Sequence, residues 1–447
     1  MTRRAVLTLI LNVVFASSLF ANHGQAAVPL AVSLSSLQMG APGRVGFDVV
    51  ISGLRPELQP TIEGSANLGG QSIQGPPGPV VAARIPASID LLAGRVRVGG
   101  DAFVAEFPPM PPVTENTPIA LEVTVRQGDE VATARQTGVL LLPTVIVPGY
   151  LNDMSGKPDP RILSVLEQRG YRARGTSPDL FWFTYPSRSL SLEKGAWALA
   201  AYVRDVVLPK TYAARINVVG YSLGGLLTRW ALAFEPGWDR LVNRFVMVGV
   251  PNEGAVMAYV NAWYPLAAPW ARTPAARDLL PTFPFWRPAR GAPWGFPPDA
   301  QNAALAELNT HPLPEGIRAY AFFGYRPLDE ERRSGTWAGV TGQLPEARFS
   351  YGPGDGIVLA ASALGLPING GAGVPGLADR LANVDLGPIG HQSLMEAAIM
   401  KIAEILTDNG AGGPIGRQRR AEGARELGGF NKADNPFFVG TGTGPRY

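Results

Sequence analysis

The sequence predicts an α/β fold with a mostly parallel sheet, preceded by a small all-β domain. Three observations support this fold class. Residues 28–142 contain short stretches of period-two alternation, as half-buried strands do. Residues 143–408 instead alternate continuous apolar runs with helical spacing. The chain of 447 residues, 46% hydrophobic and 17% charged, is long enough for two domains with sizeable cores.

The all-β prediction for residues 28–142 depends on a few segments. Residues 44–51 alternate apolar and polar side chains, and residues 120–125 and 131–135 do likewise. Gln127-Gly128-Asp129-Glu130 between the last two predicts a hairpin turn. Because glycine and proline punctuate this region and no long helical pattern appears, we expect a β sandwich.

Buried strands and amphipathic helices alternate in residues 143–408. The strands are expected at residues 144–147, 180–185, 216–219 and 244–248. The helices are expected at residues 160–168, 192–203 and 393–406, and directly after Ser222. Such alternation predicts a largely parallel sheet covered by helices.

Residues 252–315 break this alternation and are expected to form a lid or cap insertion. They are crowded with proline and contain Trp263, Trp270, Trp286 and Trp294. A connection of this length is commonly a lid or a binding element. The alternative, a capping subdomain whose aromatic rings simply pack together, stays open. The glycine- and arginine-rich tail of residues 409–447 is expected to be loosely ordered.

The first 27 residues have the pattern of a signal peptide. Arg3 and Arg4 precede a mostly apolar run at residues 5–20, and Gly24-Gln25-Ala26-Ala27 offers small residues for cleavage. We therefore expect a secreted or periplasmic protein. An uncleaved membrane anchor remains an alternative, and the choice between twin-arginine and ordinary export stays open.

Composition excludes several kinds of site. The chain has no cysteine, which rules out disulfides, thiolate metal sites and a cysteine nucleophile. Its net charge of +3 includes Arg3 and Arg4, so the rest is near neutral and no nucleic-acid partner is indicated. Composition says nothing about the oligomeric state.

The most specific motif is Gly220-Tyr221-Ser222-Leu223-Gly224. A β-branched run precedes it and an apolar-periodic helix follows, which is the strand–turn–helix context of a nucleophile elbow. The strained turn leaves no room for side chains two residues before and after the serine, which explains Gly220 and Gly224. Ser222 is therefore the predicted nucleophile.

A serine hydroxyl needs a base beside it, and the chain offers only three histidines. His23 lies in the expected signal peptide. His311 follows a short helical pattern inside the insertion and is expected at the surface. His391 precedes the last predicted helix and is the predicted base, with His311 as the alternative.

The orienting acid is expected between serine and base in the chain. Gly354-Asp355-Gly356-Ile357-Val358 supplies an aspartate on a tight glycine-flanked loop, so Asp355 is the predicted acid. A plain glycine–aspartate turn is the alternative for this loop, with Asp379 and Asp385 as reserve acids.

Two backbone N–H groups are expected to stabilise negative charge on the substrate oxygen. One is that of Leu223, directly after the nucleophile. The other is that of Tyr150 or Leu151, after the strand end Val147-Pro148-Gly149, where Gly149 permits a sharp turn.

With these motifs, residues 143–406 resemble the α/β-hydrolase superfamily, and within it the secreted lipases and the lecithin–cholesterol acyltransferase-like enzymes. Val147-Pro148-Gly149 is similar to that family's oxyanion strand end, Gly354-Asp355-Gly356-Ile357-Val358 to its acid loop, and Gly390-His391 to its base. The sequence departs from the family pattern at Tyr221, where many relatives carry histidine, and at Tyr185-Pro186-Ser187-Arg188. The resemblance implies a Ser-Asp-His triad on an α/β-hydrolase sheet.

These observations together predict a secreted serine hydrolase that cleaves carboxylic esters of lipids or other apolar acyl groups. Such a substrate is expected at a membrane or micelle interface, and the chemistry requires no metal and no cofactor. Two alternatives stay open. One is an acyltransferase or polyester depolymerase with the same triad, and the other is a non-catalytic exported binding protein with a hydrolase fold.

Overall fold

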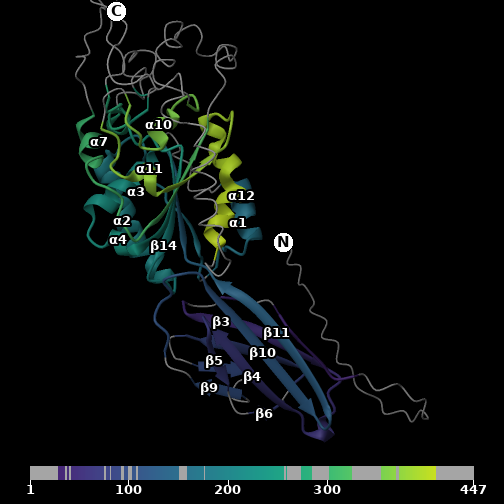
Figure 1. The fold of residues 1–447 in the computed structure, drawn as a ribbon. Coiled ribbons are helices and arrows are strands. Elements are labelled where there is room, and N and C mark those ends of the chain that lie inside the picture. Colours follow the sequence, from purple (N-terminus) through teal and green to yellow (C-terminus); the bar gives the residue numbers. More distant parts are fainter. Residues whose placement is uncertain are drawn as a thin grey trace, which may run out of the picture.

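The computed structural model of the chain is shown in Figure 1. It describes residues 29–35, 38–39, 42–74, 77–80, 82–91, 95–98, 103–106, 109–150, 159–175, 177–255, 258, 273–283, 302–324, 354–368 and 372–408. The expected signal peptide, the tail of residues 409–447 and the four tryptophans of the insertion lie outside the described residues. No helix among the described residues is long and apolar enough to cross a membrane.

Two antiparallel sheets form the N-terminal part of the molecule, at the opposite end from most of the helices (Figure 1). One sheet has the order β1-β3-β7-β8-β9, with β2 paired to β3, and the other β11-β10-β4-β5, with β6 paired to β4. The strands are β1 (Ala31–Leu34), β2 (Gln38–Met39), β3 (Arg44–Ser52), β4 (Thr61–Leu68), β5 (Gln71–Gln74), β6 (Gly78–Pro79), β7 (Arg84–Asp90), β8 (Arg95–Val98), β9 (Phe103–Glu106), β10 (Thr117–Gln127) and β11 (Glu130–Leu140). A short 3₁₀ helix, η1 (Pro56–Leu58), precedes β4.

The core of this part lies between the two sheets, because alternate residues of β3, β7 and β10 are buried. Val49 of β3 and Val123 of β10 are fully buried members of one hydrophobic cluster. The expected hairpin joins β10 to β11, with Gln127 opposite Glu130 and Gly128 at a φ of 59°. The alternating stretches identified in the sequence are therefore strands of a β sandwich.

A six-stranded parallel sheet follows, in the order β13-β12-β14-β15-β16-β17. Its strands are β12 (Thr144–Val147), β13 (Leu180–Trp182), β14 (Ile216–Tyr221), β15 (Val242–Val248), β16 (Arg318–Phe323) and β17 (Leu381–Asp385). Central strands β12 and β15 are buried along their whole length, which explains their continuous apolar runs. The predicted fold class, a mostly parallel sheet preceded by antiparallel strands, is confirmed.

Helices cover both faces of the parallel sheet (Figure 1). They are α1 (Pro160–Gln168), α2 (Leu192–Tyr202), α3 (Leu223–Phe234), α4 (Trp238–Leu241), α6 (Pro274–Arg277), α7 (Ala303–Leu308), α10 (Ala360–Ala363), α11 (Leu377–Arg380) and α12 (Leu394–Thr407). Helices α1 and α12 share one hydrophobic cluster with one face of the sheet, and α2 and α3 share another with the opposite face. A short π-helix, η2 (Val203–Val207), and a short 3₁₀ helix, η3 (Leu208–Lys210), follow α2 directly.

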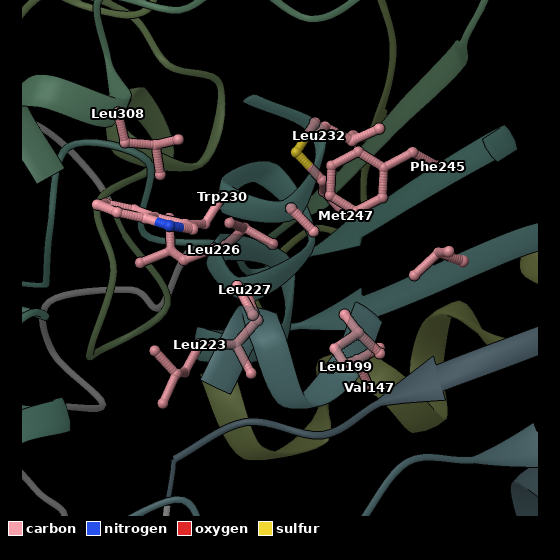
Figure 2. Close-up of a cluster of buried hydrophobic side chains, with 14 of the residues drawn as sticks. Val147, Leu199, Leu223, Leu226, Leu227, Trp230, Leu232, Phe245, Met247 and Leu308 are labelled. Atoms are coloured by element: carbon pink, nitrogen blue, oxygen red, sulfur yellow. The ribbon is translucent and has the colours of Figure 1, made fainter. Parts of the chain in front are cut away.

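The helix after the motif, α3, buries ten of its twelve residues. Figure 2 shows its apolar side chains packed among residues of the parallel sheet and of neighbouring helices. Those labelled are Leu223, Leu226, Leu227, Trp230 and Leu232 from α3, with Val147 from β12, Leu199 from α2, Phe245 and Met247 from β15, and Leu308 from α7. Because these neighbours pack around α3, they fix the position of the Ser222 turn that precedes it.

One predicted strand is shorter than expected. The sequence pattern extends from residue 180 to residue 185, but β13 ends at Trp182. Phe183 still donates its main-chain N–H to the Ile146 carbonyl oxygen of β12 at 2.9 Å, and the pairing stops there. Phe183 and Tyr185 stack on each other with ring centroids 5.1 Å apart, and both rings are buried, so the apolar run continues beyond the end of the strand.

Direct hydrogen bonds join the sandwich to the parallel-sheet part. Val113 bridges to Ala213 in a parallel pairing. The buried Asn116 side chain donates to the carbonyl oxygens of Leu406 and Asp408 at the end of α12, and accepts from the N–H of Leu142. The change of architecture therefore falls between β11 and β12, at a junction that is itself packed.

Candidate active site

Ser222 lies on the turn between β14 and α3 in a strained backbone conformation. Its φ is 51° and its ψ is −123°. Among the described non-glycine residues, only Gln59 and Ser222 have a positive φ. Such a conformation costs of the order of 1–3 kcal/mol and persists only where the surroundings enforce it. The Ser222 side chain thus stands at the carboxyl edge of the parallel sheet, where α/β proteins bind ligands.

The glycines of the motif are required by close backbone contacts. A Cβ atom on Gly220 would lie 2.5 Å from the Cα of Gly225, and one on Gly224 would lie 2.1 Å from the carbonyl oxygen of Val147. Any side chain at either position would therefore clash with main-chain atoms. The sequence-based explanation for Gly220 and Gly224 is confirmed by this geometry.

Asp355 and His391 are joined by a buried hydrogen bond. Their side chains are 3% and 6% exposed, and His391 Nδ1 lies 2.7 Å from Asp355 Oδ2. A carboxylate at this distance favours the tautomer with the proton on Nδ1, which leaves Nε2 as the basic nitrogen. The main chains are also joined, because the His391 N–H donates to the Asp355 carbonyl oxygen at 2.9 Å.

The second carboxylate oxygen of Asp355 orders its own loop. Asp355 Oδ1 accepts from the N–H groups of Ile357 at 3.0 Å and Val358 at 2.8 Å. The loop is closed by the Asp355 N–H, which donates to the Val358 carbonyl oxygen, and by a bridge between Gly354 and Leu359. The position of the Asp355 carboxylate is therefore fixed by its own loop as well as by its contact with His391.

Ser222 and His391 share neighbours at the edge of the sheet. Ser222 donates from its main-chain N–H to the Val248 carbonyl oxygen at 2.9 Å. The next residue, Gly249, lies so close to the imidazole that a Cβ there would be 3.0 Å from His391 Cε1. No hydrogen bond joins the Ser222 hydroxyl to His391 among the described residues. In serine hydrolases this contact commonly tightens when substrate binds.

Tyr221 is a site residue whose role the sequence did not predict. Its ring stacks on the His391 imidazole at a centroid distance of 5.2 Å and an interplanar angle of 29°. Its hydroxyl donates to the His391 carbonyl oxygen at 2.9 Å. Burial, with a smaller contribution from the Asp355 charge, raises the pKa of the Tyr221 phenol above its ordinary value. The sequence signals were its place beside the serine and its departure from the family pattern, and neither indicated a contact with His391.

The two predicted oxyanion donors belong to segments that touch each other. Leu223 is buried and begins α3, so its N–H belongs to the first turn, where no carbonyl inside the helix accepts it. Tyr150 follows β12, packs its ring against the core and pairs its hydroxyl with Thr273 Oγ1 at 2.8 Å. Leu151 lies outside the described residues.

A second tyrosine supports the loop after β12. The buried Tyr185 hydroxyl donates to the Pro148 carbonyl oxygen at 3.0 Å. A Cβ on Gly149 would lie 2.9 Å from Ser222 Cβ, so this loop runs directly against the Ser222 turn. The turn glycine expected at position 149 is thus also required by close approach.

The alternative base and the two reserve acids of the sequence analysis do not join the Asp355–His391 pair. His311 packs on Phe234 with ring centroids 4.6 Å apart, at the end of α3 that is farthest from Ser222. Asp385 is exposed and accepts from the Gly387 N–H at 2.7 Å, and Asp379 belongs to the short helix α11. The described residues contain no group of histidines and acids that could hold a metal ion.

Comparison with known proteins gives matches to solved structures only; no family model and no curated protein matches. The mature form of a Bacillus licheniformis lipase is 17% identical, with a TM-score of 0.41, and the match covers 60% of this chain and 93% of that one. Aspergillus fumigatus lipase B is 16% identical, with a TM-score of 0.33, covering 60% and 53%. A Pyrococcus furiosus esterase is 12% identical, with a TM-score of 0.29, covering 66% and 89%.

Three features together define one known architecture. They are the strand order of the parallel sheet, the helices on both of its faces and the strained serine turn between β14 and α3. From β12 to α12 the chain has the α/β-hydrolase fold.

Proposed function

We propose that this protein is an exported serine hydrolase that cleaves carboxylic esters of lipids or similarly apolar acyl groups. The observation that carries the proposal is the buried Asp355–His391 hydrogen bond at the same sheet edge as the strained Ser222 turn. A hydroxyl, a base and an orienting acid are the groups that acyl transfer through a serine requires.

In the proposed reaction, Ser222 Oγ attacks the ester carbonyl carbon while His391 Nε2 takes the hydroxyl proton. Asp355 holds the imidazole in the required tautomer and stabilises its charged form. The negative carbonyl oxygen accepts from the N–H groups of Leu223 and of Tyr150 or Leu151. His391 then protonates the leaving alcohol. Water, activated by the same base, hydrolyses the acyl-enzyme and releases the acid.

Two features of the sequence support the substrate class and the location. The tryptophan- and proline-rich insertion at residues 252–315 favours an apolar acyl group, because ligand sites are lined mainly by apolar and aromatic side chains. The basic start and apolar run of residues 1–27 support export. A panel of nitrophenyl esters of increasing chain length, assayed with and without micelles, tests the acyl preference.

Replacing the nucleophile tests the reaction itself. The change Ser222→Ala is expected to lower kcat by on the order of 10⁶, as in other serine enzymes with a triad. Thermal unfolding should show an intact fold. A fluorophosphonate probe should label the unmodified protein at Ser222 and leave Ser222→Ala unlabelled. Full ester hydrolysis by Ser222→Ala would refute the proposal, and failure of the unmodified protein to take the label would favour a non-catalytic binding role.

A further inference from the structure

We infer that Tyr221 is a positioning residue for the base, His391. Its side chain contacts the main chain and the imidazole of His391, and it also packs against the loop that carries Tyr150. The inference rests on the proposed function, since it assigns a role in the same reaction. It concerns a residue that lies next to the nucleophile in the chain but contacts the base 170 residues away.

The first part of the argument is how His391 is held. Asp355 supplies two contacts, one to Nδ1 at 2.7 Å and one to the main-chain N–H at 2.9 Å. Tyr221 supplies two more, the hydroxyl donating to the carbonyl oxygen and the ring stacked on the imidazole. The His391 carbonyl oxygen also accepts from the Leu394 N–H, so Tyr221 adds a second donor to it. The rotation of the imidazole is limited by Asp355 at its edge and by the Tyr221 ring on its face.

The second part is the other neighbour of Tyr221. A Cβ on Gly149 would lie 3.2 Å from Tyr221 Cδ1 and 3.2 Å from the Tyr221 carbonyl oxygen. The tyrosine therefore separates the loop after β12 from the base. A single side chain that contacts the loop after β12 and His391 keeps the predicted oxyanion donor and the proton acceptor at a constant spacing. The reaction needs this spacing because its reacting groups must be aligned with one another.

The third part is the chemistry of the hydroxyl. Packing alone would need only the ring, and phenylalanine would provide it. A buried hydroxyl without a partner costs free energy, and Tyr221 meets this requirement by donating to His391. Because burial and the Asp355 charge raise the pKa of the phenol, the hydroxyl keeps its proton and remains a donor throughout the neutral pH range.

The variant Tyr221→Phe keeps the stacked ring and removes the hydrogen bond. We expect kcat to fall by roughly tenfold with KM little changed, below the hundredfold that a misplacement of 1 Å can cost. The rate of fluorophosphonate labelling at Ser222 should fall with kcat, while the final labelled fraction stays complete. Tyr221→Leu, which also removes the ring, should lower both rates further.

The matched control is Tyr171→Phe. Tyr171 is fully buried where Tyr221 is half-buried, and it too donates its hydroxyl to a main-chain carbonyl oxygen, that of Leu406, at 3.2 Å. That bond lies at the far end of α12 from His391. Tyr171→Phe should lower the Tm at least as much as Tyr221→Phe but leave kcat and the labelling rate unchanged.

Three results separate the possibilities. A lower kcat in Tyr221→Phe than in Tyr171→Phe, at temperatures well below both Tm values, supports the inference. Equal kcat values in these two variants would overturn it and leave the proposed function intact. If Ser222→Ala keeps its activity, the proposed function itself fails, and the role of Tyr221 fails with it.

Discussion

At the scale of single residues, the two carboxylate oxygens of Asp355 do different work. Oδ2 accepts from His391, and Oδ1 accepts from two N–H groups of its own loop. Only the first of these contacts concerns the tautomer of the base. The second is structural, because it orders the loop that brings the carboxylate to the histidine. A substitution that keeps the loop contacts but changes the contact to His391 separates the two roles.

The change Asp355→Asn makes this separation. The asparagine oxygen can still accept from the loop N–H groups, while its NH₂ group faces His391 Nδ1 and favours the opposite tautomer. We expect kcat to fall by about 10⁴, as for the same change in a serine protease, with little loss of stability. Steady-state kinetics and thermal unfolding measure the two effects. His311→Ala is the control and should be fully active; an active Asp355→Asn protein would contradict the assignment of the acid.

At the scale of elements, the strand–turn–helix unit is held by close packing of glycines. Gly225 in the first turn of α3 would place a Cβ 2.1 Å from Val250 Cγ2, a side-chain atom. Gly224 would place one 2.1 Å from the Val147 carbonyl oxygen, a main-chain atom. The helix α3 can therefore approach β12 and the segment after β15 only because its second and third residues are glycines.

This difference gives a test with four variants. Gly225→Ala should destabilise the protein by about 1–3 kcal/mol, because the added methyl group overpacks the contact with Val250. Adding Val250→Ala should recover much of that loss, so the double variant is more stable than the sum of the single changes. Gly224→Ala should show no such recovery, because its clash is with the main chain. Denaturant unfolding measures these three variants and the single change Val250→Ala, and strict additivity for Gly225 and Val250 would contradict the packing argument.

At the scale of the whole molecule, a buried polar network ties distant segments to the elbow helix. Arg229 of α3 donates to the side-chain oxygens of Asn252 at 3.1 Å and Asn309 at 3.0 Å. Asn309 donates to Glu253 Oε1 at 2.7 Å, and the Thr282 hydroxyl donates to the other oxygen of that carboxylate. Burial lowers the pKa of Arg229 to about 10 and raises that of Glu253. The described parts of residues 252–315 are thus bonded to α3, the helix that follows Ser222.

The raised pKa of Glu253 has a consequence for stability against pH. Between its ordinary pKa of 4.5 and its raised value, the folded protein binds the Glu253 proton more tightly than the unfolded chain. The contribution of this group to the unfolding free energy is therefore complete below that window and declines as the pH rises through it. Glu253→Gln cannot titrate, so the wild type should lose stability relative to this variant as the pH rises from about 4.5.

Denaturant unfolding of both proteins across that range measures the difference. The control is Glu307→Gln, an exposed glutamate on α7 in the same region of the chain. Its stability should follow that of the wild type at every pH. A wild type that gains stability relative to Glu253→Gln as the pH rises would show that the carboxylate is favoured by its surroundings, contrary to this prediction.

Much of the fold could be predicted because local patterns report burial. The helix at residues 160–168 and the strand at residues 144–147 have the expected bounds, since apolar spacing is set by the face that each element buries. The pattern misled at residues 183–185, where Phe183 and Tyr185 are buried against each other beyond the end of β13. An apolar run does not distinguish pairing in a sheet from packing beside it.

The sequence by itself determined the type and order of the elements, the glycine-flanked Ser222 turn and the short list of possible bases, because these depend on local backbone and composition. Tertiary structure alone decided that Asp355, the aspartate predicted from chain order, lies within hydrogen-bond distance of His391, that Tyr221 contacts His391, and that Arg229 binds Asn252 after β15. These contacts join residues far apart in the chain. They exist because parallel strands bring their carboxyl ends to one edge, and no local pattern records which loops meet there.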